Sequence, residues 1–244
     1  MALIDLANPT RFRTLAETLL PWLAAATVVA FGLGLEQAYL APDDYQQGAT
    51  VKIMFLHVPS AWLSMMAWGL MSVAALGTLV WRHPLADVAA KAAAPLGAAF
   101  TLLCLVTGSL WGRPMWGTYW VWDARLTSEL VLLLMYLGLL AVWRTIDDPI
   151  RAARAAAVLT LVGAIDLPII KFSVDWWNTL HQPASVFRIG GSTIDASLLV
   201  PLFVMAIAFT LLFFTLHLAA MCNEILRRRV RTLMMLQAQA AGGH

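Results

Sequence analysis

The sequence predicts an all-α, polytopic membrane protein: a bundle of six transmembrane helices with both termini in the cytoplasm. The first observation is composition, since 61% of the residues are hydrophobic and only 12% are charged, against about 25% charged in soluble domains. The second is a series of apolar runs, each close to the ~20 residues that cross a bilayer as a helix. Helices are expected because backbone polar groups in lipid must be satisfied within the segment. The third is an uneven distribution of Lys and Arg, which sets the orientation.

The predicted spans follow the apolar runs along the chain. Residues 1–18 carry several charges, and the run that starts at Leu19 exceeds the ~7–15 residues of a signal-peptide core, so the first span is expected to be retained. The spans leave no room for a soluble domain, and we expect a membrane domain over 1–225 followed by a basic cytoplasmic tail over 226–244. The predicted spans are 19–40, 58–81, 92–111, 126–143, 155–172 and 196–221.

Basic residues gather on one side of this arrangement, which is predicted to be the cytoplasm. The predicted outer loops are 41–57, 112–125 and 173–195. No G-x-x-x-x-G-K-[ST] sequence occurs, so nucleotide hydrolysis through a P-loop is excluded for this chain. The basic tail is interpreted as a topology anchor and not as a nucleic-acid-binding segment. The few basic residues assigned to the outer side are Lys52, Arg113, Arg125, Lys171 and Arg188.

The second outer loop, "WGRPMWGTYWVWDAR" at about 111–125, is rich in tryptophan. Its glycine and proline residues favour a loop over a buried helix. One interpretation is an interfacial aromatic belt, where Trp and Tyr are commonly enriched. The other is a platform for a flat ligand, because Gly112 and Gly117 allow close approach of the backbone. The indoles that would form the platform belong to Trp111, Trp116, Trp120 and Trp122.

Two histidines, His57 and His181, fall at the outer boundary on either side of this loop. His57 lies just before Pro59, and proline is common in the first turn of a helix, so His57 is expected at the mouth of the second span. Taken singly, each is more simply a hydrogen-bonded boundary residue. Together they are able to ligate one haem iron from opposite sides, as axial histidine pairs do. Candidate cations for the haem propionates are Lys52, Arg113 and Arg125.

Several other polar residues have simpler explanations. Asp123 is predicted to be the N-cap of the fourth span, and Arg125 and Glu129 are spaced to pair on one helix face. Asp166 lies within the fifth span, where an ionisable group suggests function, but a structural hydrogen bond is the favoured interpretation. The two cysteines, Cys104 and Cys222, are expected to contribute packing only.

The tryptophan-rich stretch resembles the "WWD" signature of haem-handling membrane proteins. Its pattern W-G-x-x-x-W-G-x-x-W-x-W-D runs from Trp111 to Asp123. Within that group the chain is similar to the heme exporter protein C (CcmC) family of the bacterial cytochrome c maturation machinery. The segments "DDYQQG" at 43–48, "LHVPSAW" at 56–62 and "WWNTLHQPAS" at 176–185 carry the same resemblance in the same order. It covers most of the chain and is weakest after about residue 225.

The resemblance implies a function. His57 and His181 fall on the family's two outer-loop histidines, the expected axial ligands of haem b, which is bound transiently as cargo. The WWD loop, with Asp123 and Arg125, would form the platform that faces haem on the periplasmic side of the inner membrane. The expected partners are a periplasmic haem chaperone, an ATP-binding subunit, a second membrane subunit and a small membrane subunit of an ABC-type complex. The chain is expected to be neither an enzyme nor, lacking C-x-x-C-H, a c-type cytochrome.

Two other functions are considered on the residues alone. A b-type membrane electron carrier would hold haem between histidines on facing spans, and the predicted spans contain no mid-span histidine pair. A permease for a small solute or for haem would carry polar or broken segments near the midplane, where Asp166 is the one candidate.

Overall fold

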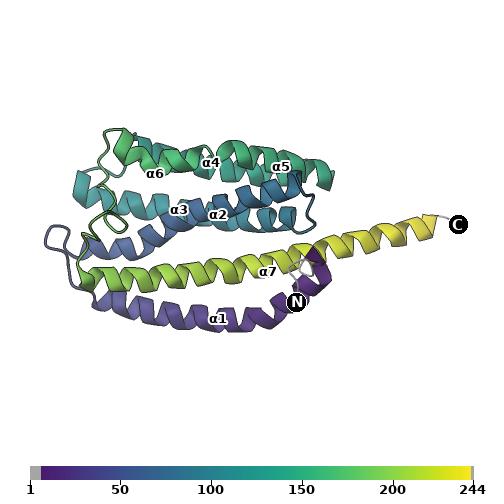
Figure 1. Cartoon of the computed structure of the whole chain (residues 1–244), viewed down its shortest axis with the longest axis horizontal. Helices are drawn as coiled ribbons and strands as arrows, with labels where there is room; N and C mark the ends of the chain where they lie inside the picture. Colours follow the sequence, from purple (N-terminus) through teal and green to yellow (C-terminus); the bar gives the residue numbers. More distant parts are fainter. Residues whose placement is uncertain (1–6, 243–244) are drawn as a thin grey trace.

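The computed structural model describes residues 7–242, which form helices joined by short connections (Figure 1). Six of the helical segments are long and apolar enough to cross a membrane, so the prediction of an all-α, six-span protein is confirmed. The elements are α1 (Pro9–Leu40), η2 (Ala49–Ile53), α2 (Met54–Leu79), α3 (Ala86–Trp116), α4 (Ala124–Thr145), α5 (Pro149–Gly163), α6 (Asp166–Trp176) and α7 (Ala196–Gly242).

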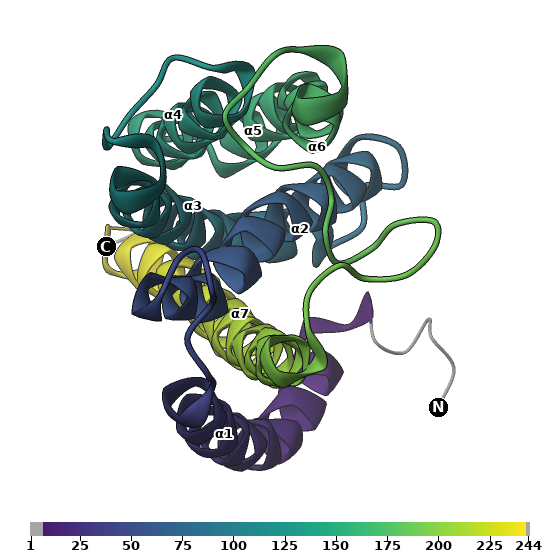
Figure 2. The ribbon, with the colours of Figure 1, turned by 90° about the vertical axis from the view of Figure 1, so that its left-hand side faces the viewer.

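The helices are stacked in layers, and α1 packs on the side of α7 that faces away from α2 and α3 (Figures 1 and 2). The pair α2 and α3 lies in the middle, with α4, α5 and α6 on one side and α1 and α7 on the other (Figures 1 and 2). Small residues let α2 and α3 pack closely against their neighbours, as is common between helices in membranes. Gly97 of α3 is one example, because a Cβ there would lie 2.3 Å from the ring of Tyr136. The Tyr136 hydroxyl, buried by this contact, donates to the carbonyl of Ser64 at 2.7 Å.

The helix ends differ from the predicted ones at the functionally interesting positions. Helix α2 begins at Met54, directly after η2, so Pro59 lies inside the helix and not in its first turn. Helix α3 continues to Trp116 and ends at Gly117, whose φ of 74° and N–H bond to Arg113 O stop it. Glycine readily adopts this left-handed conformation, which explains the position of the end. The stretch 111–116 is therefore helical, and only 117–123 forms the loop.

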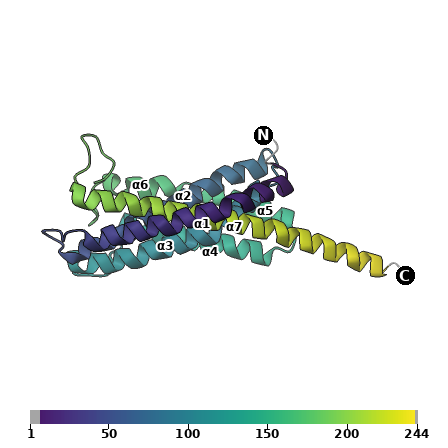
Figure 3. The same ribbon diagram turned by 90° about the horizontal axis from the view of Figure 1, so that it is seen from below.

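The fifth span is also divided. It consists of α5 and α6, separated at residues 164–165. Asp166 begins α6, and its Oδ2 has no hydrogen-bond partner among the described residues. The expected structural hydrogen bond is therefore not made by this oxygen. The sixth span continues as α7 without a break through residue 226 to Gly242 and extends well beyond the bundle (Figure 3).

The connections 41–48, 117–123 and 177–195 lie together at one end of the bundle (Figures 1 and 3). The start of α1 and the far part of α7 lie at the opposite end. The three predicted outer loops are thus on a common side, although each is shorter than predicted. This grouping brings the tryptophan-rich stretch near both boundary histidines.

Candidate functional site

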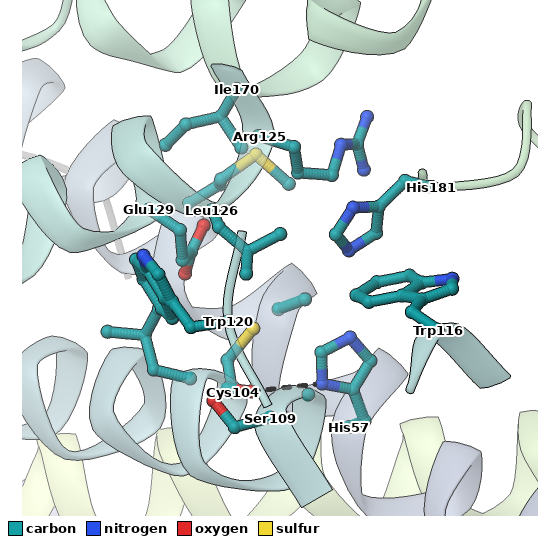
Figure 4. Close-up of a pocket in the computed structure, with 14 residues that line it drawn as sticks. His57, Cys104, Ser109, Trp116, Trp120, Arg125, Leu126, Glu129, Ile170 and His181 are labelled. Carbon is teal, nitrogen blue, oxygen red and sulfur yellow. Dashed lines mark hydrogen bonds between the residues drawn. The ribbon is translucent and has the colours of Figure 1, made fainter. Parts of the chain in front are cut away.

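A cavity at the loop end of the bundle brings His57 and His181 together (Figure 4). Its walls come from α2, α3, α4 and α6 and from the loops 117–123 and 177–195. A second cavity beside it is lined by the same two histidines and by Trp116. The two imidazoles therefore face shared space, although they are far apart in the sequence.

The His57 ring is fixed by helix α3. Its Nδ1 lies 3.0 Å from the carbonyl of Cys104 and 3.2 Å from Thr107 Oγ1. The ring rests on Gly108, where a Cβ would lie 2.8 Å from its Cε1. A carbonyl oxygen only accepts, so Nδ1 carries the hydrogen and Nε2 is left with its lone pair. This is the arrangement that orients a metal-ligating histidine through its other nitrogen.

The His181 ring is held by a side chain from another loop. Its Nδ1 lies 3.4 Å from Asp123 Oδ2, and the hydroxyl of Thr179 donates to the same oxygen. The other oxygen of Asp123 caps α4 by accepting from Leu126 N at 2.8 Å. Asp123 is therefore the predicted N-cap and also the residue that ties the loop 177–195 to the start of α4.

The electrostatics of this pair favour a neutral imidazole. Burial lowers the pKa of His181 from its ordinary value, although the Asp123 carboxylate opposes this and Arg125 adds to it. Burial tends to raise the pKa of Asp123, but bonds from Thr179 and Leu126 N and the nearby His181 lower it overall. At neutral pH Asp123 is thus an anion and His181 an uncharged base, which is the form that ligates a metal.

The four tryptophans of this stretch occupy different environments. Trp116 contacts His181 edge to face, with ring centroids 4.8 Å apart, and Figure 4 shows its indole between the two imidazoles. Trp111 lies edge-on to His57 and donates from Nε1 to Gln47 Oε1 at 2.8 Å. Trp120 lines the cavity farther in. Trp122 is 77% exposed and lies outside both cavities.

Gly112 lies within α3 and makes room for the Trp116 ring. A Cβ at Gly112 would lie 2.7 Å from the Trp116 ring, one turn further along α3. The missing side chain therefore provides the seat for the indole, and Gly112 does not act as a helix breaker. Gly117 contributes the positive φ that ends the helix.

The three candidate cations are placed differently. Arg125 lines the cavity, donating from Nε to Ser173 Oγ at 3.0 Å and from Nη2 to the carbonyl of Lys171 at 3.3 Å. Lys52 instead donates to Tyr39 O, and Arg113 donates to Gly117 O and lies over the ring of Tyr119. Neither Lys52 nor Arg113 lines the two cavities.

The predicted ion pair between Arg125 and Glu129 is not formed. The guanidinium is directed at α6, and Glu129 Oε1 is buried without a hydrogen-bond partner among the described residues. Glu129 is nevertheless in the wall of the cavity.

Sequence reasoning missed the residues that position the histidines. Cys104 contributes its backbone carbonyl, which no residue pattern reports, and Thr107 and Gly108 lie within an unremarkable apolar run. Gln47 is in the segment "DDYQQG" and Thr179 is in "WWNTLHQPAS", and neither segment indicates a role for these two residues. The position of Thr179, two residues before His181, was the sequence feature that could have indicated a role in holding this histidine.

Known proteins match this chain along nearly its whole length. The CcmC family, described as heme exporter protein C, matches residues 2–236. Heme exporter protein C of Bradyrhizobium diazoefficiens is 79% identical over 238 residues, covering 98% of this chain and 90% of the relative. Heme exporter protein C of Escherichia coli K12 is 49% identical over 223 residues, with coverage of 91% and 90%. A putative cytochrome c biosynthesis ccmC-like mitochondrial protein of Marchantia polymorpha is 44% identical over 194 residues, with coverage of 80% and 81%. The chain belongs to the heme exporter protein C family.

Proposed function

We propose that this chain binds haem b as transient cargo between His57 and His181 and presents it to a periplasmic haem chaperone during maturation of c-type cytochromes. The observation that carries the proposal is the geometry of the two imidazoles. Both line one cavity, and in each Nδ1 is engaged by the protein, which leaves both Nε2 atoms for an iron. The names of the relatives support haem as the cargo.

The residues present suit an iron porphyrin. Two neutral imidazoles would supply the axial ligands, a common arrangement for haem iron. Indoles and aliphatic side chains from α2, α3 and α4 line the cavity, and Arg125 is the cation best placed for a propionate. Since the Trp116 indole lies between the imidazoles, we propose that it moves aside to form one face of the site.

Delivery to the chaperone would take place on the loop side. His181 is carried by the loop 177–195, and loops are more mobile than helices, so release would begin with this ligand. Trp122 is exposed beside Trp120, with ring centroids 5.5 Å apart, and would contact the chaperone. A vinyl edge left outward would be open to attack by the chaperone's histidine. The loop end faces the periplasm in this proposal, and α7 ends in the cytoplasm.

The chain would act within an ABC-type complex in the bacterial inner membrane. Because no P-loop occurs in the sequence, ATP hydrolysis would come from an ATP-binding subunit. A second membrane subunit and a small membrane subunit would complete the assembly. The chain itself would bind and deliver haem without catalysing a reaction on it.

Co-expression with the periplasmic chaperone tests the proposal. We expect the haem-loaded chain and the chaperone to purify together, with haem transferred to the chaperone. Trp122→Ala should reduce this transfer while haem stays on the chain. Trp81→Ala, an exposed tryptophan in the connection between α2 and α3, should leave transfer unchanged. Equal transfer in both variants would contradict the role of Trp122. Haem that is reduced by quinol and never transferred would favour the electron-carrier alternative.

A further inference from the structure

Glu129 is a buried acidic residue that the proposed haem site does not use. It lies on α4 in the wall of the cavity that contains His57 and His181. Its exposed fraction is 6%, and Oε1 has no hydrogen-bond partner among the described residues. Figure 4 shows the carboxyl group on the inner side of the cavity, away from the loop that carries His181. An unpaired buried carboxylate is costly, so such groups are retained where an opposite charge compensates them.

The protein compensates the charge of this carboxylate only in part. Arg125 is one helical turn away and interacts electrostatically with Glu129, but its guanidinium donates to Ser173 Oγ and Lys171 O of α6 and forms no ion pair with the carboxylate. Ser64 of α2 and Cys104 of α3 form hydrogen bonds with the carboxyl group, whereas the acidic Asp166 of α6 repels its negative charge. Within residues 7–242, no Lys, Arg or His nitrogen approaches Glu129 closely enough to form an ion pair. The missing charge is therefore expected from a ligand.

The ligand proposed for the cavity supplies a charge of this kind in one oxidation state. A ferric porphyrin with two neutral imidazole ligands has one net positive charge at its core, and the ferrous form has none. A carboxylate in the same low-dielectric cavity stabilises the positive core, since screening by water is weak there. The effect is absent for the ferrous core, which carries no net charge.

We propose that Glu129 is a fixed counter-charge that makes this site bind ferric haem more tightly than ferrous haem. The inference rests on the proposed function, because it requires haem between His57 and His181. The redox change is a single electron added to or removed from the iron, which a chemical reductant or oxidant supplies in the experiment. Glu129 would thus determine which oxidation state of the cargo is held.

Spectroelectrochemical titration of the purified, haem-loaded chain in lipid nanodiscs tests this role. We expect Glu129→Gln to raise the reduction potential, because on the order of a tenfold preference for ferric haem is lost, or about 59 mV for one electron. Glu129→Asp retains the charge and should stay near the parent value. Ser109→Ala, a neutral change in the same cavity wall, is the matched control and should leave the potential unchanged.

A second variant gives the opposite prediction and does not depend on removing Glu129. Ser109→Asp adds a carboxylate to the same cavity and should lower the potential. An unchanged or lowered potential in Glu129→Gln, or an unchanged or raised one in Ser109→Asp, would overturn the proposal. If Glu129→Gln yields no folded protein, the Ser109→Asp titration decides alone.

The absorption spectrum separates this inference from the proposed function. If Glu129→Gln has the same spectrum as the parent and an unshifted reduction potential, the counter-charge role of Glu129 is contradicted, but the proposed haem site is not. A haem spectrum that survives replacement of both His57 and His181 contradicts the ligand assignment on which it rests.

Discussion

His57 and His181 face the same cavity but are positioned by different means. His57 lies in the first turn of α2, between the buried residues Phe55 and Pro59, and its ring bonds to a backbone carbonyl of α3. His181 lies in the loop 177–195, and a single carboxylate, Asp123, holds its ring. One proposed ligand is thus built into the helical bundle, and the other is attached to it by a side chain.

Because of this difference, we propose that His57 retains haem and that His181 releases it. Moving His57 would disturb packing between α2 and α3, which forms the middle layer of the fold. Moving His181 requires only the loss of the contacts of Asp123 and Trp116, and loop segments open at lower free-energy cost than packed helices. We infer that His57 remains in place while His181 leaves the iron when haem is delivered. The prediction that both histidines are on outer loops is wrong for His57, because His57 lies in helix α2.

The largest effect is expected when both regions lose their imidazole. His57→Ala combined with His181→Ala should reduce the haem that purifies with the protein by at least about a hundredfold, because both iron–nitrogen bonds are lost. Haem content is measured by absorption per mole of protein. His83→Ala, in the exposed connector at the other end of the bundle, is the control. Equal haem content in the double variant and in this control would contradict the proposal that His57 and His181 bind the iron.

The next effect isolates the side-chain attachment of His181. Asp123→Asn keeps a good helix cap but removes the anion that orients the imidazole, so haem affinity should fall by about 10–100-fold. Asp148→Asn is the matched control, since Asp148 caps α5 through the same kind of bond, to Arg151 N at 2.8 Å. Affinities come from haem titration of the apoprotein. A loss of the same size in both variants would contradict the orienting role of Asp123.

The corresponding change beside His57 is expected to matter less. Thr107→Val removes one neighbour of His57 Nδ1, but the Cys104 carbonyl still accepts at 3.0 Å. Haem affinity should therefore change by less than about fivefold, in line with the ~1 kcal/mol of one ordinary hydrogen bond at most. A loss as large as that of Asp123→Asn would mean that the helix-borne ligand is no better fixed than the loop-borne one.

The smallest effect is expected from mild acidification. Protons compete with iron for Nε2, and burial holds the pKa of His181 below its ordinary 6.5. Haem retention should therefore be constant from about pH 8 to 6.5 and fall only at lower pH, where the imidazole becomes protonated. In Asp123→Asn the anion that raises the His181 pKa is gone, so the acid loss should move to still lower pH. A midpoint above pH 6.5 in the parent would contradict the direction of the shift.

Much of this arrangement was accessible from the sequence. The apolar runs gave the six spans, and the tryptophan-glycine pattern with His57 and His181 identified the end of the bundle where the cavity lies. The helical course of 111–116 was not predictable from glycine and proline content, because Gly112 serves as a seat for Trp116. The directions of Arg125 and Glu129 depend on packing against α6, which helix spacing does not report. The backbone carbonyl that orients His57 carries no residue signature at all.

The central claim is that His57 and His181 share one iron. Electron paramagnetic resonance of the ferric protein reports the number of strong axial ligands, and we expect a low-spin signal for two imidazoles in the parent. His57→Gly and His181→Gly should each turn high-spin and return to low-spin when free imidazole is added. Low-spin signals identical to the parent in both single variants, without added imidazole, would contradict the claim.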